Sequence, residues 1–115
     1  MKIDRFEEII AWQKAKDLTL RLYLLFKDNR DFAFRDQICR ASLSIMNNIA
    51  EGFERNSDKE FKHFLFIAKG SSGEVRSMIY LAADLKYIDT ITFNELLESS
   101  TEISRLLSGL IKTLS

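Results

Sequence analysis

The stretch IAKGSSGEVRSMI, residues 67–79, decides the fold, because its two glycines and two serines suit either a loop or the inside of a helix. A lysine beside glycines and serines also suggests a phosphate-binding loop, whose pattern is GxxxxGK and then Ser or Thr, directly after a strand. Here Glu74 follows the second glycine, and its carboxylate would repel a phosphate group. The stretch therefore does not predict a nucleotide-binding loop.

Apolar and small residues keep one helical phase across these glycines. They recur at steps of three and four: Phe64, Ala68, Ser71, Val75, Met78, Ala82 and Leu85. An unbroken phase predicts one helix through the stretch, with the glycines in its interior. Each glycine costs about 0.5–1 kcal/mol relative to alanine inside a helix. We therefore expect Gly70 and Ser71 to lie where a neighbouring backbone approaches closely.

The segment 6–28 carries two adjacent apolar stripes at helical spacing. The first, expected to face the core, is Ala11, Ala15, Leu18, Leu22 and Leu25, and the second is Ile9, Trp12, Thr19, Tyr23 and Phe26. Together they form a face wider than a bundle helix needs. Trp12 and Tyr23 are therefore candidates for contact with another subunit, and the alternative is that they only border the core.

A second helix is predicted from about residue 33 to residue 55. Its inward residues are Phe34, Ile38, Ala41, Ile45 and Ile49, and a polar stripe on another side is Gln37, Arg40, Ser44, Asn47 and Glu51. Asn48 lies beside that stripe among apolar residues, and a buried amide must find hydrogen-bond partners. Such groups can fix an oligomer contact, so Arg40, Asn47 and Glu51 are candidate subunit contacts.

Two capping boxes predict the starts of the remaining helices, since the cap hydroxyl accepts from the third amide while a glutamate reaches back. They are Ser57–Glu60 and Thr92–Glu95. The last helix keeps one face to its end: Phe93, Leu97, Ser100, Ile103, Leu107, Leu110 and Leu114. Four helices with short connections predict an all-α fold, an antiparallel up-down-up-down four-helix bundle, in a single domain over residues 1–115.

The composition agrees with a helical globular domain: 46% of residues are hydrophobic, 30% are charged, and proline is absent. The 17 basic and 17 acidic residues give a formal net charge of zero, so any nucleic-acid binding must come from a local patch. Cys39 is the single cysteine, which excludes an internal disulfide and fits a reducing compartment. Without a secretory signal or an apolar run long enough for a membrane span, we expect a cytoplasmic protein.

No catalytic or metal-binding set emerges from the sequence. His63 is the single histidine, and although Glu60 lies three residues before it, no second pair of this kind would complete a di-metal site. A hydrolase triad would need the same His63 as its base. We therefore predict no enzyme, no cofactor and no small-molecule substrate.

One ordered pattern of charge lies on the third helix. Lys59, Lys62, Lys69 and Arg76 fall on one face, with Phe66 in line between them. This stripe is about 25 Å long at 1.5 Å per residue. It could follow a phosphate backbone with Phe66 as a stacking surface, and the alternative is an ordinary solvated helix face.

The motifs RASLSIMNNIAEGFER, residues 40–55, and FLFIAKGSSGE, residues 64–74, resemble the bacterial four helix bundle protein family, whose first described members are encoded in intervening sequences of 23S ribosomal RNA genes. The residues that match the family pattern RA-x-x-SI-x-x-NIAEG are Arg40, Ala41, Ser44, Ile45, Asn48, Ile49, Ala50, Glu51 and Gly52. The resemblance extends to WQKA in the first helix. The chain departs from the family at Met46, where proline is frequent, and at KDNRD, residues 27–31, where a Phe-Pro pair is frequent.

This resemblance implies an up-down bundle that assembles as a homopentamer and has no known enzymatic activity. The family is also similar to the accessory proteins of diversity-generating retroelements, strongly basic pentamers that bind nucleic acid. The zero net charge of this chain argues against a direct transfer of that role. Two functions remain: a self-associating interaction or scaffold protein, and a protein that binds structured RNA, with ribosomal RNA the candidate, through the basic stripe.

Overall fold

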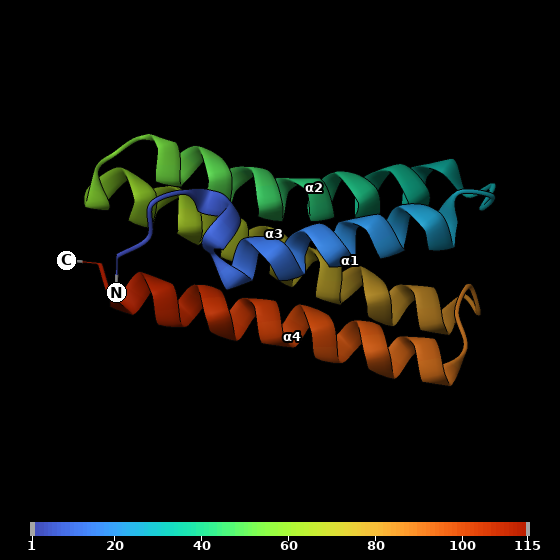
Figure 1. The fold of residues 1–115 in the computed structure, drawn as a ribbon. Coiled ribbons are helices and arrows are strands. Elements are labelled where there is room, and N and C mark those ends of the chain that lie inside the picture. The colour runs from blue at the N-terminus through green and yellow to red at the C-terminus, as the bar shows by residue number, and fades with distance from the viewer. Residues whose placement is uncertain (1, 115) are drawn as a thin grey trace.

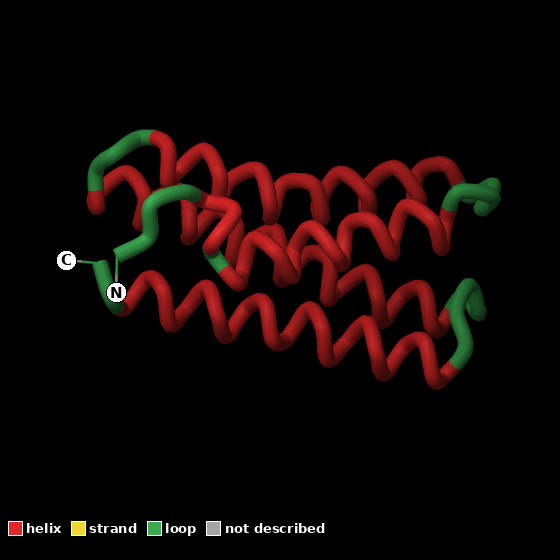
Figure 2. Tube along the Cα trace, viewed as in Figure 1, coloured by secondary structure: helices red, strands yellow, loops and turns green. Residues whose placement is uncertain are grey.

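Residues 2–114, the part of the chain that the computed structural model describes, form four α-helices and one short 3-10 helix. These are η1 (Phe6–Glu8), α1 (Ile10–Phe26), α2 (Phe32–Glu54), α3 (Asp58–Asp84) and α4 (Thr90–Lys112). Consecutive helices run in opposite directions, and each packs against two neighbours, α1 and α4 closing the ring (Figure 1). Figure 2 shows how short the connections between them are. The predicted antiparallel four-helix bundle is confirmed.

Helix α3 runs unbroken through the opening stretch, as its apolar phase predicts. Ser57 caps it by accepting a hydrogen bond from the Glu60 amide at 3.4 Å, so the first predicted helix start is confirmed. The Glu60 carboxylate accepts from Arg55 at 3.3 Å instead of reaching back to the cap. The second predicted capping box is wrong: Asp89 caps α4 by accepting from the Thr92 amide at 2.7 Å, and α4 begins at Thr90.

The first helix begins later than residue 6. Phe6–Glu8 form the 3-10 helix η1, and the backbone is extended at Ile9 before α1 starts. Ile9 is buried at this break, and the Phe6 ring packs edge-on against Trp12 with ring centroids 5.1 Å apart. The break therefore turns η1 back over the side of the bundle, where it covers part of Trp12.

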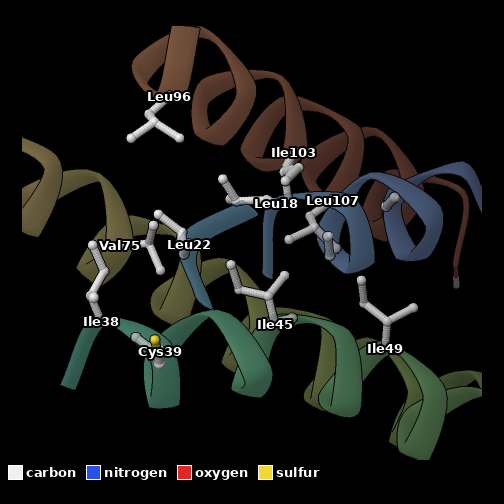
Figure 3. Close-up of a cluster of buried hydrophobic side chains, with 14 of the residues drawn as sticks. Leu18, Leu22, Ile38, Cys39, Ile45, Ile49, Val75, Leu96, Ile103 and Leu107 are labelled. Carbon is white, nitrogen blue, oxygen red and sulfur yellow. The ribbon is translucent and has the colours of Figure 1, made fainter. Parts of the chain in front are cut away.

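The core is a column of aliphatic side chains contributed by all four helices (Figure 3). In α2 the predicted inward residues are all buried, and Ile38, Ile45 and Ile49 are completely so. Fully burying one such side chain contributes about 1.5–3 kcal/mol. Two buried hydroxyls near the middle of the bundle form hydrogen bonds between helices. Ser72 Oγ on α3 donates to the Ser100 carbonyl on α4 at 3.2 Å, and Thr19 Oγ1 on α1 donates to the Ser42 carbonyl on α2 at 3.1 Å.

Three predicted core faces are partly displaced around their helices. In α4, Ser100, Ile103 and Leu107 are buried as predicted, but Leu96 and Ile111 are buried in place of Leu97 and Leu110. In α1, Phe26 is buried, with 1% of its surface exposed, whereas Leu25 is 39% exposed. In α3 the fully inward line is Phe61, Leu65, Ala68, Ser72, Val75, Ile79 and Ala82. The predicted α3 line shares the buried Ala68, Val75 and Ala82 with this one. Of its other members, Phe64 and Ser71 lie half-buried against α2, and Leu85 is exposed. A stripe that borders a second helix is also apolar, so the pattern alone did not separate the two lines.

Asp31 and Tyr87 join the two loops at the end of the bundle opposite the chain termini (Figure 1). Asp31 caps α2 by accepting from the Phe34 amide at 3.2 Å, and it also accepts from the Tyr87 hydroxyl at 2.6 Å. These two hydrogen bonds hold the pKa of Asp31 below its ordinary value of 3.8, and the one from Tyr87 has the larger effect. The carboxylate therefore stabilises the fold only while it is ionised.

We expect Tyr87→Phe to lower the urea midpoint of unfolding near pH 7. We also expect the midpoint of this variant to fall less than that of the wild type as the pH is lowered. Because the folded-state pKa of Asp31 is lowered, the stabilisation is fully present above pH 3.8 and is lost as the pH falls through the lower folded-state pKa. Tyr87→Phe removes the largest cause of that shift. Tyr23→Phe, at an exposed tyrosine of α1, is the matched control and should leave the midpoint unchanged when both variants are measured as monomers. Equal acid sensitivity in wild type and Tyr87→Phe would contradict this assignment.

Candidate interaction surfaces

Exposed apolar side chains gather at the end of the bundle that holds the 27–31 and 85–89 loops. Of the twelve large apolar residues that are exposed among the described ones, nine lie in this half of the molecule. We call them the loop-end apolar set: Leu20, Tyr23, Leu24, Leu25, Phe32, Tyr80, Leu81, Leu85 and Ile91. Scattered exposed apolar residues are normal, but their concentration at one end makes this end a candidate interaction surface.

Within this set, Leu20 and Leu24 lie on the side of α1 that faces away from the core, and they are 60% and 59% exposed. Leu20, Leu24 and Leu25 line a shallow depression of about 470 Å³ together with Asp17 and Arg21. Tyr23, a predicted subunit contact, is 45% exposed in the single chain. Trp12, the other, is half-buried beneath Phe6, which supports its interpretation as a residue that borders the core.

The polar stripe of α2 divides into a packed part and an exposed part. Ser44 Oγ lies 2.8 Å from Ser71 Oγ on α3, and Asn48 Nδ2 donates to the Ser44 carbonyl at 2.8 Å and to its hydroxyl at 2.9 Å. The partners that Asn48 required are therefore on its own helix. Ser44 and Ser71 thus connect α2 to α3, and Asn48 supports this contact through its bonds to Ser44.

The exposed part of that stripe consists of Arg40, Asn47 and Glu51. Glu51 pairs with Arg55 at 2.9 Å, one turn along the helix, and this hydrogen bond raises the pKa of the Arg55 guanidinium. Arg40 donates to Gln37 at 3.4 Å. These residues remain accessible for a subunit contact.

The closest contact between helices is not at the glycines of α3, where the sequence predicted it. A Cβ added at Gly70 or Gly73 would meet nothing within 4 Å, so no neighbouring backbone of this chain approaches there. The close approach is at Gly52 in α2, where an added Cβ would lie 2.6 Å from Phe64 Cβ. Gly52 therefore sets how near α3 lies to α2.

The structure brings half of the basic stripe into a groove between α3 and α4. The groove has a volume of about 480 Å³ and is lined by Lys69, Arg76, Thr101, Ser104, Arg105, Ser108, Gly109 and Lys112. We call it the α3–α4 groove. Its lining holds four cationic side chains and no carboxylate, and none of the four belongs to an ion pair within residues 2–114. Such a groove suits a ligand with several negative charges.

Lys59 and Lys62 do not line this groove, and neither does Phe66, whose ring is 53% exposed. Sequence reasoning missed Arg105 and Lys112, which belong to another helix. Their spacing of seven residues matches that of Lys69 and Arg76 and was the available signal. It becomes informative once α3 and α4 are known to be neighbours.

Cys39 and His63 form no recognisable reactive centre. Cys39 is buried, and burial raises the pKa of its thiol, which disfavours the reactive thiolate. His63 packs edge-on against Phe64, with ring centroids 5.6 Å apart. Across the described part of the chain, no three His, Cys, Asp or Glu side chains come together as a metal site would require. No described helix combines the length and apolar character needed to cross a membrane.

Comparisons with known proteins give the chain a family context. A family model described as 23S rRNA-intervening sequence protein matches residues 7–109. The chain is also similar to a crystal structure from Bacteroides thetaiotaomicron VPI-5482, described as a protein with unknown function from the S23 ribosomal protein family. The two are 27% identical with a TM-score of 0.82, and the match covers 90% of this chain and 96% of that chain. No curated protein matches.

Proposed function

The chain belongs to the 23S rRNA-intervening sequence protein family, and we propose that it acts without catalysis, as an interaction protein that assembles from copies of itself. The observation that supports this proposal is the loop-end apolar set. Exposing that many apolar side chains at one end of a small domain is unfavourable in water, and covering them in an oligomer removes the penalty. The pentamer remains an expectation from the family resemblance.

Charged substitutions on the outer side of α1 test self-association. Light scattering behind size exclusion should give wild type a mass about five times that of the 13.4 kDa chain. We expect Leu20→Lys/Leu24→Lys to give the mass of a single chain, because a buried lysine in the contact is costly whereas an exposed one on a helix is not. Helicity by circular dichroism should not change.

Ile10→Lys/Ile67→Lys is the matched control, since both side chains are exposed but lie outside the loop-end apolar set. This control should keep the wild-type mass. A monomeric wild type would refute self-association itself. An unchanged mass for Leu20→Lys/Leu24→Lys would show that copies associate through another surface.

A second candidate function is binding to structured RNA, with ribosomal RNA the candidate through the family context. The α3–α4 groove supports it, because it concentrates positive charge in a chain whose net charge is zero. Five copies would present about twenty such charges, and repetition of weak sites strengthens binding. The same scattering measurement with a 23S ribosomal RNA fragment separates the two functions. A salt-sensitive complex supports RNA binding, and an oligomer that ignores the fragment supports the scaffold.

A further inference from the structure

We propose that the α3–α4 groove binds the sugar–phosphate backbone of single-stranded RNA, and that Arg105 and Lys112 contact phosphates together with Lys69 and Arg76. This inference rests on the second candidate function. It places the contact on an unpaired segment of the structured RNA and adds two residues outside the basic stripe. The proposed contact thereby moves from the predicted stripe, Lys59 to Arg76, to an open groove that two helices line.

The four cations lie on both sides of the α3–α4 groove. Lys69 and Arg76 lie on α3, and Arg105 and Lys112 lie on α4, each pair about 10.5 Å apart along its helix at 1.5 Å per residue. Axes of packed helices lie about 8–10 Å apart. Helices at this spacing are in contact, so a ligand lies over the seam between them, where the four cations border a strip about as narrow as one nucleic-acid strand. The geometry therefore favours a single strand.

Two of the acidic residues near the groove in sequence are engaged on other sides of the bundle. Glu74 accepts a hydrogen bond from Gln37 on α2, and Glu102 pairs with Lys14 on α1 at 3.4 Å. Both carboxylates are thus drawn away from the α3–α4 seam. Glu98, seven residues before Arg105 on α4, reduces the positive charge at one end of the groove, whereas Glu74 and Glu102 do not.

Hydroxyls rather than aromatic rings occupy the rest of the lining. Thr101, Ser104 and Ser108 can donate to phosphate oxygens and can exchange hydrogen bonds with a ribose 2′-hydroxyl, the group that distinguishes RNA from DNA. No aromatic side chain lines the groove, so it offers bases no stacking surface. Binding through this groove should be insensitive to base sequence and tighter for RNA than for DNA.

The test is fluorescence anisotropy with a labelled oligouridine of about 16 nucleotides, a length within the range of single-strand sites. Four phosphate contacts on a single strand predict a slope of log K against log salt near −2.8, or roughly 50-fold weaker binding at 200 mM than at 50 mM salt. Arg105→Gln/Lys112→Gln should bring the slope to about −1.4 and raise Kd about 25-fold at 0.1 M salt. Both side chains are exposed, so folding should be preserved.

Lys59→Gln/Lys62→Gln removes the same charge outside the groove and is the matched control, expected to change Kd little. Equal losses of affinity in both double variants would overturn the assignment of binding to the groove, because they would show an effect of overall charge alone. A loss confined to the control pair would overturn the groove while RNA binding stands. Wild type that does not bind the oligouridine overturns the assignment of the groove to single-stranded RNA, whereas wild type that binds neither the oligouridine nor the 23S ribosomal RNA fragment also overturns the RNA function. Equal affinity for oligothymidine, or tighter binding to duplex RNA, would overturn the assignment to single-stranded RNA.

Discussion

Phe26→Ala is expected to lower the free energy of unfolding by about 3–5 kcal/mol, the usual cost of removing a buried phenylalanine. Phe26 is 1% exposed at the end of α1 and packs edge-on against Phe34, whose ring in turn contacts Tyr87. The substitution would therefore leave a cavity and break a chain of aromatic contacts that ties α1 to the loop before α4. For a domain with a stability of about 5–15 kcal/mol, the loss is a large fraction of the total.

Leu25→Ala is the control that makes this result specific. Leu25 is the adjacent residue and 39% exposed, so its truncation should cost a small fraction of the Phe26→Ala effect. Chemical denaturation of both variants, under conditions where the wild type is monomeric, gives the comparison. Similar losses in the two variants would mean that α1 is rotated relative to the orientation described above.

The contrast between Phe26 and Leu25 also shows which part of the fold the sequence does not predict. Four helices follow from apolar residues at helical steps, and the continuity of α3 follows from a phase that glycines do not interrupt. The rotation of a helix depends on where its two neighbours lie, because residues facing a neighbour are apolar as well. Leu25 was therefore expected inside in place of Phe26, and in α3 Phe64, Ser71 and Met78 in place of Leu65, Ser72 and Ile79.

The candidate surfaces were also predictable within a single helix but not across helices. Lys69 and Arg76 follow from a repeat within one helix, but Arg105 and Lys112 join them only through the packing of α3 against α4. Likewise, Ser44 and Asn48 lie within one turn of the exposed Arg40 and Asn47 in sequence, and only the position of α3 separates a packed group from an accessible one. Contacts between helices carry information that no single periodicity contains.

Gly52→Ala is expected to destabilise the protein by about 1–3 kcal/mol, the range for overpacking, even though alanine is the better helix former. The added Cβ would lie 2.6 Å from Phe64 Cβ and 3.2 Å from Phe61 Cδ1. Phe64 Cβ is attached directly to the α3 backbone, so no change of rotamer can move it away. Relief therefore requires α2 and α3 to separate, which loosens the core on either side.

Gly70→Ala makes the same chemical change inside α3, where the new methyl group would meet nothing within 4 Å. It should stabilise the monomer by about 0.5–1 kcal/mol, because alanine has less conformational freedom to lose on folding. Opposite signs for one substitution in two helices, measured by urea denaturation, would locate the close helix contact at Gly52. Stabilisation by both would mean that α2 and α3 are further apart than described. If Gly70→Ala instead weakens self-association without lowering monomer stability, the open surface at Gly70 contacts another copy, and the glycines of the GSSG stretch serve the assembly rather than the bundle.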